Sequence, residues 1–279
     1  MMVRASKTMK SILLFLAVVA LCLLVLVPFI FMVSYSLRTN AELYDFGITL
    51  IPKNITFSSY VDLWKNNAML TTWIWNTLYV TGVSTLLVVI ASTMMGYAIA
   101  RFRFKGRKGI WFTLAMTQSI PWVIALIPLY MTLSSFKMLD RMNTVMWIYT
   151  ACFIPTSTWL LVGFFKKIPQ ELDDAARIDG CSNWGVLLRI VLPVSMNALS
   201  AIALTAFIGG WGDYITATTI LKSKGHWTLP IAIQYLKGPF YTEWTQIMAL
   251  GTIISVPVVI LFLWLEKYLV NLMAGGIKE

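Results

Sequence analysis

Residues 11–36 read SILLFLAVVALCLLVLVPFIFMVSYS, a run that contains no charged side chain. A helix needs about 20 apolar residues to cross the hydrocarbon core of a bilayer, and this run exceeds that length. A signal peptide would have a shorter apolar run followed by a small-residue cleavage site, and neither feature is found here. The run therefore predicts a membrane-spanning helix.

The composition extends this prediction to the whole chain. Of 279 residues, 58% are hydrophobic and only 12% are charged, whereas about a quarter of the residues of a soluble domain are charged. We expect an all-α membrane protein with six transmembrane helices. The predicted spans cover about residues 11–36, 71–100, 109–133, 144–165, 194–221 and 245–270.

The basic residues indicate how the chain is oriented. The net charge is +10, but the lysines and arginines lie in short segments between apolar runs, as in the cluster at 101–108. Such loops face anionic cytoplasmic lipids, so we expect no nucleic-acid partner. Six crossings place both termini on the side richer in these residues. We therefore predict a cytoplasmic N-terminus (1–10), a transmembrane domain (11–270) and a cytoplasmic tail (271–279).

Catalytic and metal sites are not expected. His226 is the only histidine, and the three cysteines, Cys22, Cys152 and Cys181, lack the spacing of metal ligands. A membrane enzyme would need a cluster of nucleophile, base or metal ligands. The sequence does not supply one, so we predict no catalytic residue and no metal ligand.

The segment 166–193 lies between the fourth and fifth spans, and residues 168–193 read IPQELDDAARIDGCSNWGVLLRIVLP. Pro169 suits a first helical position, and Gly180 suits the left-handed residue that ends a helix. Ser182 or Asn183 can cap a second helix. Acidic residues fill the first turn, where the helix dipole favours negative charge. They are Glu171, Asp173 and Asp174.

The first of these short helices is predicted to bind a partner protein. Its spacing places Leu172, Ala175, Ala176 and Asp179 on one side. The helix is too short and polar to cross lipid. An interfacial helix lying on the membrane is the alternative, but it would turn acids toward an anionic leaflet and lacks a bulky apolar stripe. Docking onto a cytoplasmic protein is the better account.

The same segment resembles the permeases of ATP-binding cassette (ABC) importers. Their signature is Glu-Ala-Ala, three residues, Gly, nine residues, then Ile-x-Leu-Pro, and this chain differs only by having Asp174 in place of the glutamate. The resemblance implies a type I ABC importer permease fold, with cytoplasmic coupling helices that dock in a groove of an ATPase subunit. The implied coupling residues are Glu171, Asp174, Ala175, Ala176, Gly180, Ile190, Leu192 and Pro193.

Further motifs are similar to the carbohydrate branch, in particular the smaller maltose-type permease. They are Asn54-Ile-Thr-Phe with Tyr60, Tyr97-Ala-Ile-Ala-Arg101, Ile178-Asp-Gly180, Thr228-Leu-Pro230 and the ending Leu272-Met-Ala-Gly-Gly-Ile-Lys-Glu279. In that branch the tail reaches between two ATPase subunits, so Ala274, Gly275 and Lys278 are expected to contact the ATPase. Gly276 and Glu279 depart from the branch's ending.

The resemblance also implies a set of partners. We expect a second homologous permease subunit, two ATP-binding cassette ATPase subunits and an extracytoplasmic sugar-binding protein, in the cytoplasmic membrane of a bacterium or archaeon. The chain has no Gly-x-x-x-x-Gly-Lys-Ser/Thr loop. We therefore expect no cofactor on this chain, with ATP and Mg²⁺ bound by the partner ATPase.

Three residues are candidates for the path of the sugar. Asp213 is the acid inside the fifth predicted span, beside Trp211, and an ionisable group at membrane depth is a functional candidate. A hydrogen bond between helices, helped by close glycine packing, explains it equally well. Gln118, beside Pro121, is a weaker candidate than these two residues. In the maltose-type case the resemblance implies that the larger permease partner holds much of the sugar site. A secondary transporter coupled to protons or sodium should show inverted repeats and several membrane carboxylates, so it is the weaker alternative.

Overall fold

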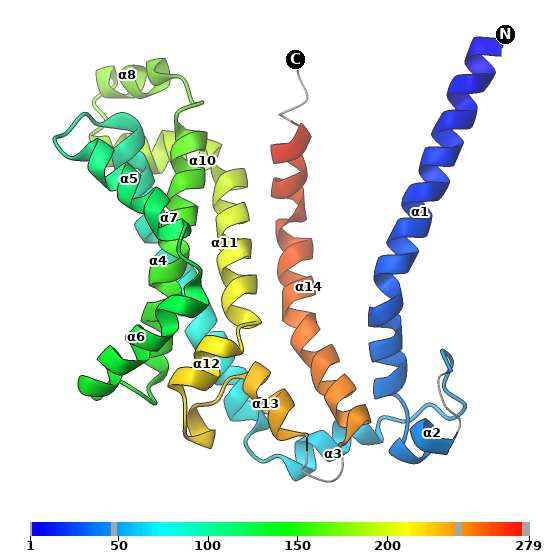
Figure 1. The fold of residues 1–279 in the computed structure, drawn as a ribbon. Helices are drawn as coiled ribbons and strands as arrows, with labels where there is room; N and C mark the ends of the chain where they lie inside the picture. The colour runs from blue at the N-terminus through cyan, green and yellow to red at the C-terminus, as the bar shows by residue number, and fades with distance from the viewer. Residues whose placement is uncertain (1, 46–48, 238–241, 275–279) are drawn as a thin grey trace. The chain divides into compact units, whose positions relative to one another are not determined.

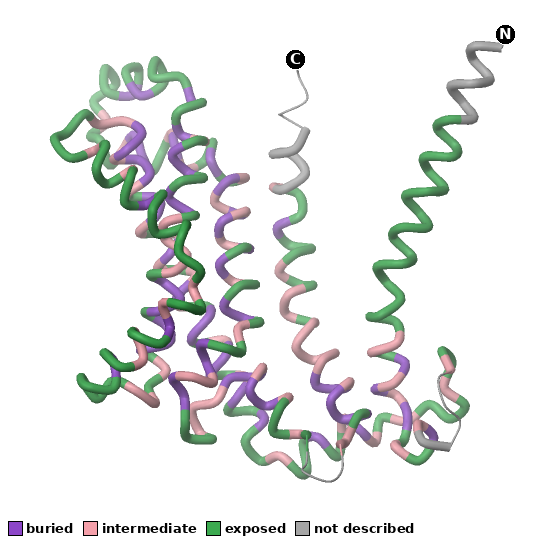
Figure 2. The backbone as a smooth tube through the Cα atoms, in the orientation of Figure 1, coloured by how far each residue is buried: buried purple, intermediate pink, exposed green. Residues whose placement is uncertain are grey.

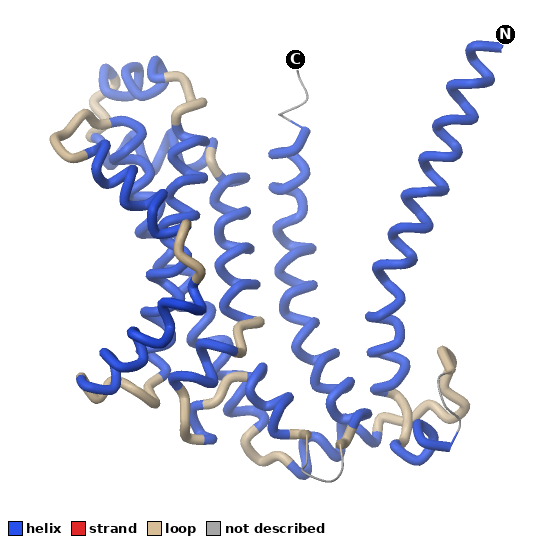
Figure 3. The backbone as a smooth tube through the Cα atoms, viewed as in Figure 1, coloured by secondary structure: helices blue, strands red, loops and turns tan. Residues whose placement is uncertain are grey.

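A computed structural model describes the backbone of residues 2–45, 49–237 and 242–274, and the side chains of residues 10–43, 49–237 and 242–268. Within these residues the chain is helical and holds no strand (Figure 3). An isolated antiparallel bridge joins Lys237 to Thr242. The all-α prediction is confirmed.

Four described helices are long and apolar enough to cross a membrane. They are α1 (Met2–Ser36), α4 (Leu70–Arg101), α7 (Met142–Phe165) and α14 (Trp244–Ala274). Two bent pairs bring the described spans to six if each pair counts as one: α5 (Arg107–Gln118) with α6 (Trp122–Ser135), bent by 100°, and residues 183–194 with α11 (Met196–Trp211), bent by 79°.

Two predicted spans are thus interrupted where the sequence predicted continuous helices. The third breaks at Ser119–Pro121, because Pro121 has no N–H to continue the ladder. The fifth divides into α11 and α12 (Ile215–Ile220), because the carboxylate of Asp213 accepts hydrogen bonds from the first amides of α12. In both cases hydropathy correctly identified an apolar segment, but the prediction that the segment forms one continuous helix was wrong.

The chain divides into two compact units, which are described separately. The first comprises residues 1–68 and 233–256, with α1, α2 (Asn40–Asp45), α3 (Ser58–Asn66) and the first turns of α14. Residues 10–30 of α1 are exposed along the whole run (Figure 2), as expected of an apolar helix that faces lipid or another chain.

The segment that follows α1 folds back on the end of that helix around Arg38, which is fully buried. Its guanidinium donates to the hydroxyls of Thr49 (2.8 Å) and Ser34 (3.0 Å). The backbone carbonyl of Arg38 accepts a hydrogen bond from the Ser59 hydroxyl of α3 at 3.0 Å. The stretch between α1 and α4 therefore carries two short helices, and the buried arginine bonds to the second of them, α3.

The second unit comprises residues 69–232 and 257–279, and α4 packs against both α7 and α11 within it. Gly210 of α11 makes the close approach feasible, because a Cβ there would lie 2.7 Å from Thr81 Cγ2 and 3.1 Å from Tyr149 Cδ2. In Figure 1 the short helix α8 (Gln170–Ile178) lies at one end of this unit, and α6 and α12 lie near the other.

The far end of α4 is tied to the loop that precedes α13 (Leu229–Tyr235). The Trp73 indole donates to the Lys224 carbonyl at 2.7 Å, and the Asn76 amide donates to the carbonyls of Gly225 and Trp227 at 2.8 and 2.9 Å. These bonds fix one loop to the end of one long helix.

Candidate functional site

The segment 166–193 forms two short helices with a break between them, as the sequence predicted. Pro169 directly precedes α8, and Gly180 has φ +85° just after it, the left-handed conformation that ends a helix. Ser182 caps α9 (Asn183–Val186), because its hydroxyl accepts from the Gly185 amide at 3.2 Å. Of the two capping residues that the sequence allowed, the structure uses Ser182.

The α8 helix has one inner face and one outer face. Asp173 and Ala176 are its buried residues, and Ala176 belongs to an apolar cluster with Phe165, Ile168 and Val186. The remaining residues are exposed. Ala176 therefore packs against its own chain, and the outer face retains most of the predicted docking residues, namely Glu171, Leu172, Asp174, Ala175 and Asp179.

A buried ion pair joins α8 to the end of α4. Arg101 Nε lies 2.9 Å from Asp173 Oδ2, and the two side chains are 3% and 2% exposed. Arg101 Nη2 also donates to the Ile168 carbonyl at 3.0 Å. Sequence reasoning did not assign this pair, although Asp173 shares the inner face of α8 with Ala176, three residues later.

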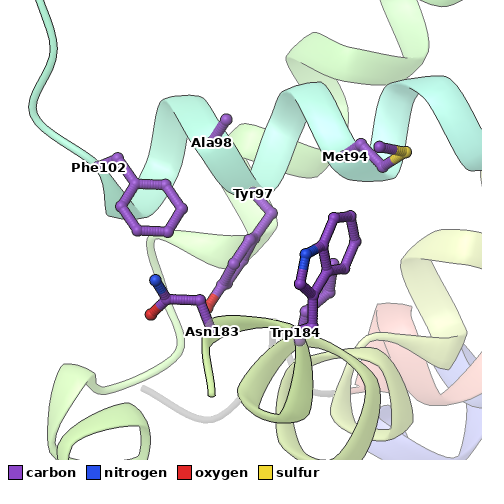
Figure 4. Close-up of a pocket in the computed structure, with 7 residues that line it drawn as sticks. Met94, Tyr97, Ala98, Phe102, Asn183 and Trp184 are labelled. Carbon is purple, nitrogen blue, oxygen red and sulfur yellow. The ribbon is translucent and has the colours of Figure 1, made fainter.

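A pocket of about 330 Å³ lies at the same end of α4, between α4 and α9. Figure 4 shows Met94, Tyr97 and Phe102, at the end of α4, on one side, with Asn183 and Trp184 of α9 on the other. The Tyr97 ring packs edge-on against Phe102, with the ring centroids 5.7 Å apart. The second short helix is therefore not packed tightly against α4 on this side.

The end of the motif forms a π-helical turn, Leu187–Val191, followed by α10 (Leu192–Val194). Ile190 and Leu192 pack against the apolar cluster that contains Ala176, and Pro193 is exposed. Proline cannot donate to the carbonyl four residues earlier, so a local departure from α-helical bonding precedes it. Such π turns frequently occur at functional sites.

Trp211 and Asp213 lie close to each other in well-packed surroundings. Trp211 is 2% exposed and stacks on Phe207, with the ring centroids 5.3 Å apart. Asp213 Oδ2 accepts from the Tyr149 hydroxyl (2.8 Å) and from the amides of Thr216 (3.1 Å) and Ala217 (3.2 Å). This is the arrangement expected of the interhelical hydrogen bond that the sequence left open.

Gln118 is the last residue of α5, and neither Trp211 nor Asp213 lines the groove beside it. Gln118 is exposed and lines this groove, which has a volume of about 590 Å³, together with Trp122, Cys152 and Pro155. The structure therefore does not bring the three path candidates into one site. Trp122 connects the two regions, because its indole donates to the Thr216 hydroxyl of α12 at 3.1 Å.

The predicted tail residues lie at the limit of the described chain. Ala274 is the last residue of α14, while Gly275 and Lys278 lie outside the described residues. Across the described residues, no group of three or more His, Cys, Asp or Glu side chains could hold a metal ion.

Comparison with known proteins shows that the chain matches a protein family. A model described as "Binding-protein-dependent transport system inner membrane component" matches residues 88–275. The arabinooligosaccharides transport system permease protein of Halalkalibacterium halodurans is 30% identical over 254 residues, covering 90% of each chain. The sulfoquinovosyl glycerol transport system permease protein of Agrobacterium fabrum is 32% identical over 254 residues, covering 91% of this chain and 89% of the relative.

Two solved structures have the same architecture. A chain of a bacterial ABC transporter involved in the import of the acidic polysaccharide alginate superposes with a TM-score of 0.82 at 23% identity, covering 94% of this chain and 97% of that one. A chain of a bacterial alginate ABC transporter, in complex with an alginate pentasaccharide-bound periplasmic protein, gives 0.65 at 18% identity, covering 93% and 94%. These matches confirm the predicted fold class.

Proposed function

The chain belongs to the family of inner membrane components of binding-protein-dependent transport systems, and on this premise we propose that it is the permease subunit of an ATP-driven importer of sugars or oligosaccharides. Relatives named for the transport of arabinooligosaccharides, galactooligosaccharides and maltodextrin support the substrate class. The chain forms half of the translocation path, and a second homologous permease forms the other half.

The observation that carries this proposal is the two-faced helix α8. Asp173 ties its inner face to α4, while the acidic outer face with Glu171 and Asp174 is uncovered. A short polar helix held rigidly at a helix end is suited to receive force from a docked protein. We assign segment 166–193 as the coupling segment and Gly180, Ile190, Leu192 and Pro193 as residues that maintain its shape.

The mechanism is alternating access driven by two partner ATPases, which bind ATP and Mg²⁺. Nucleotide binding closes the ATPases, moves α8 and rocks the bundle from inward-facing to outward-facing. A sugar-binding protein delivers its ligand on the outer side. Both termini (1–10 and 271–279) lie in the cytoplasm of a bacterial or archaeal cell, and the tail residues Ala274, Gly275 and Lys278 contact the ATPases.

The path candidates take different roles in this proposal. Asp213 joins α12 to α7 through its hydrogen bonds, and Trp211 is buried and stacks on Phe207 of its own helix. Gln118 is exposed beside a groove and is the residue assigned to the path.

The first test is affinity purification of the tagged chain in mild detergent, with identification of its partners. We expect an ATPase and a second permease to be recovered. Asp174→Lys should lose the ATPase, because it reverses the charge on the docking face, while the second permease should remain bound. Asp62→Lys is the matched control, since it reverses an exposed acid in a segment expected on the outer side.

A pure homo-oligomer without an ATPase, after gentle crosslinking, would contradict the proposal and favour a secondary transporter. Uptake assays with reconstituted complex and binding protein then identify the sugar. Maltotriose, arabinotriose and galactotriose are the first panel, chosen from the substrates for which the relatives are named.

A further inference from the structure

The break between α5 and α6 leaves backbone groups without helical partners. In a continuous helix the Thr117 carbonyl would accept from residue 121, but Pro121 has no N–H. The Ser119 amide turns back to the Met116 carbonyl at 3.1 Å. The chain then bends by 100° into α6, so the Gln118 carbonyl also loses the partner that a straight helix would provide.

The length of α5 predicts that this break lies near the middle of the membrane. The basic cluster at Arg107 marks the start of α5, and Gln118 is the last residue of that helix. With a rise of 1.5 Å per residue, the helix reaches up to about 17 Å into the bilayer, roughly half of the ~30 Å hydrocarbon core.

An exposed break at this depth is not compatible with lipid. Residues 117–121 are all exposed, and irregular backbone at membrane depth occurs only where protein or a water-filled cavity covers it. The structure places a groove of about 590 Å³ directly beside the break. Either the partner permease or a water-filled path along this groove therefore covers the free carbonyls.

The groove has the chemistry of a site for a neutral, hydroxyl-rich ligand. Gln118 supplies an amide, which donates and accepts, and Thr117 and Thr156 supply hydroxyls. Trp122 contributes an indole whose position is fixed by its 3.1 Å bond to Thr216. Of the described residues that line the groove, none is an acid or a base.

We propose that the groove at the α5–α6 break is a sugar contact of this chain, with Gln118 bonding to sugar hydroxyls and Trp122 packing against a ring face. The proposal rests on the assignment of the chain as a sugar permease. It also favours a neutral substrate over an anionic one, because none of the described residues that line the groove carries a positive charge.

Thiol labelling tests whether the groove is open to water. Gln118→Cys is compared with Met116→Cys, which lies two residues away and therefore about 200° around the same helix. Both positions are exposed in the chain, but Met116 does not line the groove. The probe is 2-sulfonatoethyl methanethiosulfonate, an anionic, water-soluble reagent, applied to the assembled complex in nanodiscs.

Peptide mass spectrometry reports each cysteine separately, so the native cysteines stay in place. We expect the cysteine at 118 to react at least about tenfold faster than the one at 116. Equal rates at 116 and 118 would overturn the proposal, since slow rates would mean that the partner permease covers the break and fast rates would mean that water reaches the helix on both sides.

Uptake tests the sugar contact itself, with the panel of three neutral trisaccharides. At saturating binding protein, Gln118→Ala should reduce the uptake rate about three- to tenfold, the equivalent of one hydrogen bond. ATP hydrolysis stimulated by the binding protein should stay within about twofold. Gln118→Asn, which keeps the amide, should recover part of the rate, and Met116→Ala should have no effect.

The outcomes separate this inference from the proposed function. Unchanged uptake by Gln118→Ala, or an equal loss in Met116→Ala, would overturn the groove assignment while the wild-type complex still transports. If the wild-type complex recruits no ATPase and takes up none of the sugars, the proposed function fails, and the sugar contact fails with it.

Discussion

The guanidinium of Arg101, the last residue of α4, lies 2.9 Å from the carboxylate of Asp173 in α8, and both side chains are almost completely buried. A second ion pair of the same length joins Arg177 to Asp174 on the outer face of α8, where the side chains are 40% and 67% exposed. Two neighbouring acids of one short helix thus make equally close pairs in opposite environments.

Removal of Asp173 should therefore destabilise the protein far more than removal of Asp174. Asp173→Ala leaves a buried, unpaired guanidinium, which costs about 3–5 kcal/mol, whereas loss of an exposed pair costs less than about 1 kcal/mol. Thermal unfolding of the purified complex in one detergent measures the difference. Arg101→Leu/Asp173→Leu should recover most of the stability, because it leaves no unpaired charge. Equal shifts for Asp173→Ala and Asp174→Ala would contradict the burial argument.

Gly180 should tolerate a residue that accepts positive φ, but not a β-branched one. Its φ is +85°, and an added Cβ would meet nothing within 4 Å, so backbone strain is the main obstacle to substitution within the chain. Asparagine enters the left-handed region readily, while valine does not. We expect Gly180→Val to lower the ratio of sugar uptake to ATP hydrolysed and Gly180→Asn to stay near wild type. Equal impairment by both would point to a steric contact with the ATPase instead.

The packing at Gly210 should respond to a compensating change in α4. A methyl group at this position would lie 2.7 Å from Thr81 Cγ2, and such overpacking costs about 1–3 kcal/mol. Gly210→Ala should therefore lower the melting temperature of the complex. Thr81→Ser removes the clashing methyl group and keeps the hydroxyl that bonds to the Thr77 carbonyl, so the double variant should recover part of the loss. Additive effects of the two changes would show that the close approach is not the cause.

Asp140 should hold the loop after α12 in place. Partial burial works against its ionisation, but hydrogen bonds from the Ser223 hydroxyl, from the amides of Ser223 (2.9 Å) and Lys222 (2.8 Å), and from His226 hold the pKa of this carboxyl well below its usual range. A lowered pKa in the folded protein means that the ionised carboxylate stabilises the loop at pH values above the ordinary value of about 3.9. This contribution is lost only as the pH falls through the lowered pKa.

Tryptic cleavage at Lys222 and Lys224 measures the opening of this loop near neutral pH. Asp140→Ala should speed cleavage about tenfold, equivalent to about 1.4 kcal/mol, because two backbone amides lose their acceptor. Asp140→Asn keeps one acceptor oxygen and should give an intermediate rate. Unchanged cleavage in Asp140→Ala would show that the loop is held elsewhere.

The long spans could be predicted from the sequence because hydropathy alone decides them. The predicted helix 71–100 corresponds to α4, Leu70–Arg101, and 144–165 corresponds to α7, Met142–Phe165. Helix interruptions were harder to predict. Pro128 and Pro155 remain inside α6 and α7, whereas Pro121 lies at a break. A proline frees one carbonyl in every case, and the surrounding chain decides whether the helix continues.

The coupling segment could be predicted because its signals are local. The acids of the first turn, Gly180 and the cap at Ser182 act on residues within one or two helical turns. The pair between Arg101 and Asp173 joins positions 72 residues apart, and no local pattern specifies which acid of α8 turns inward. The groove at Gln118 likewise depends on how α5, α6 and α7 meet, which a single sequence does not encode in any short stretch.

The helix α4 is held at both of its ends, by Arg101 to α8 and by Trp73 and Asn76 to the loop before α13. Binding events at two sites that share one rigid element are thermodynamically reciprocal. Any factor by which docking of a protein on α8 changes the binding of a partner at that distant loop is therefore shared by the two events. Binding at the loop must alter the docking affinity at α8 by the same factor.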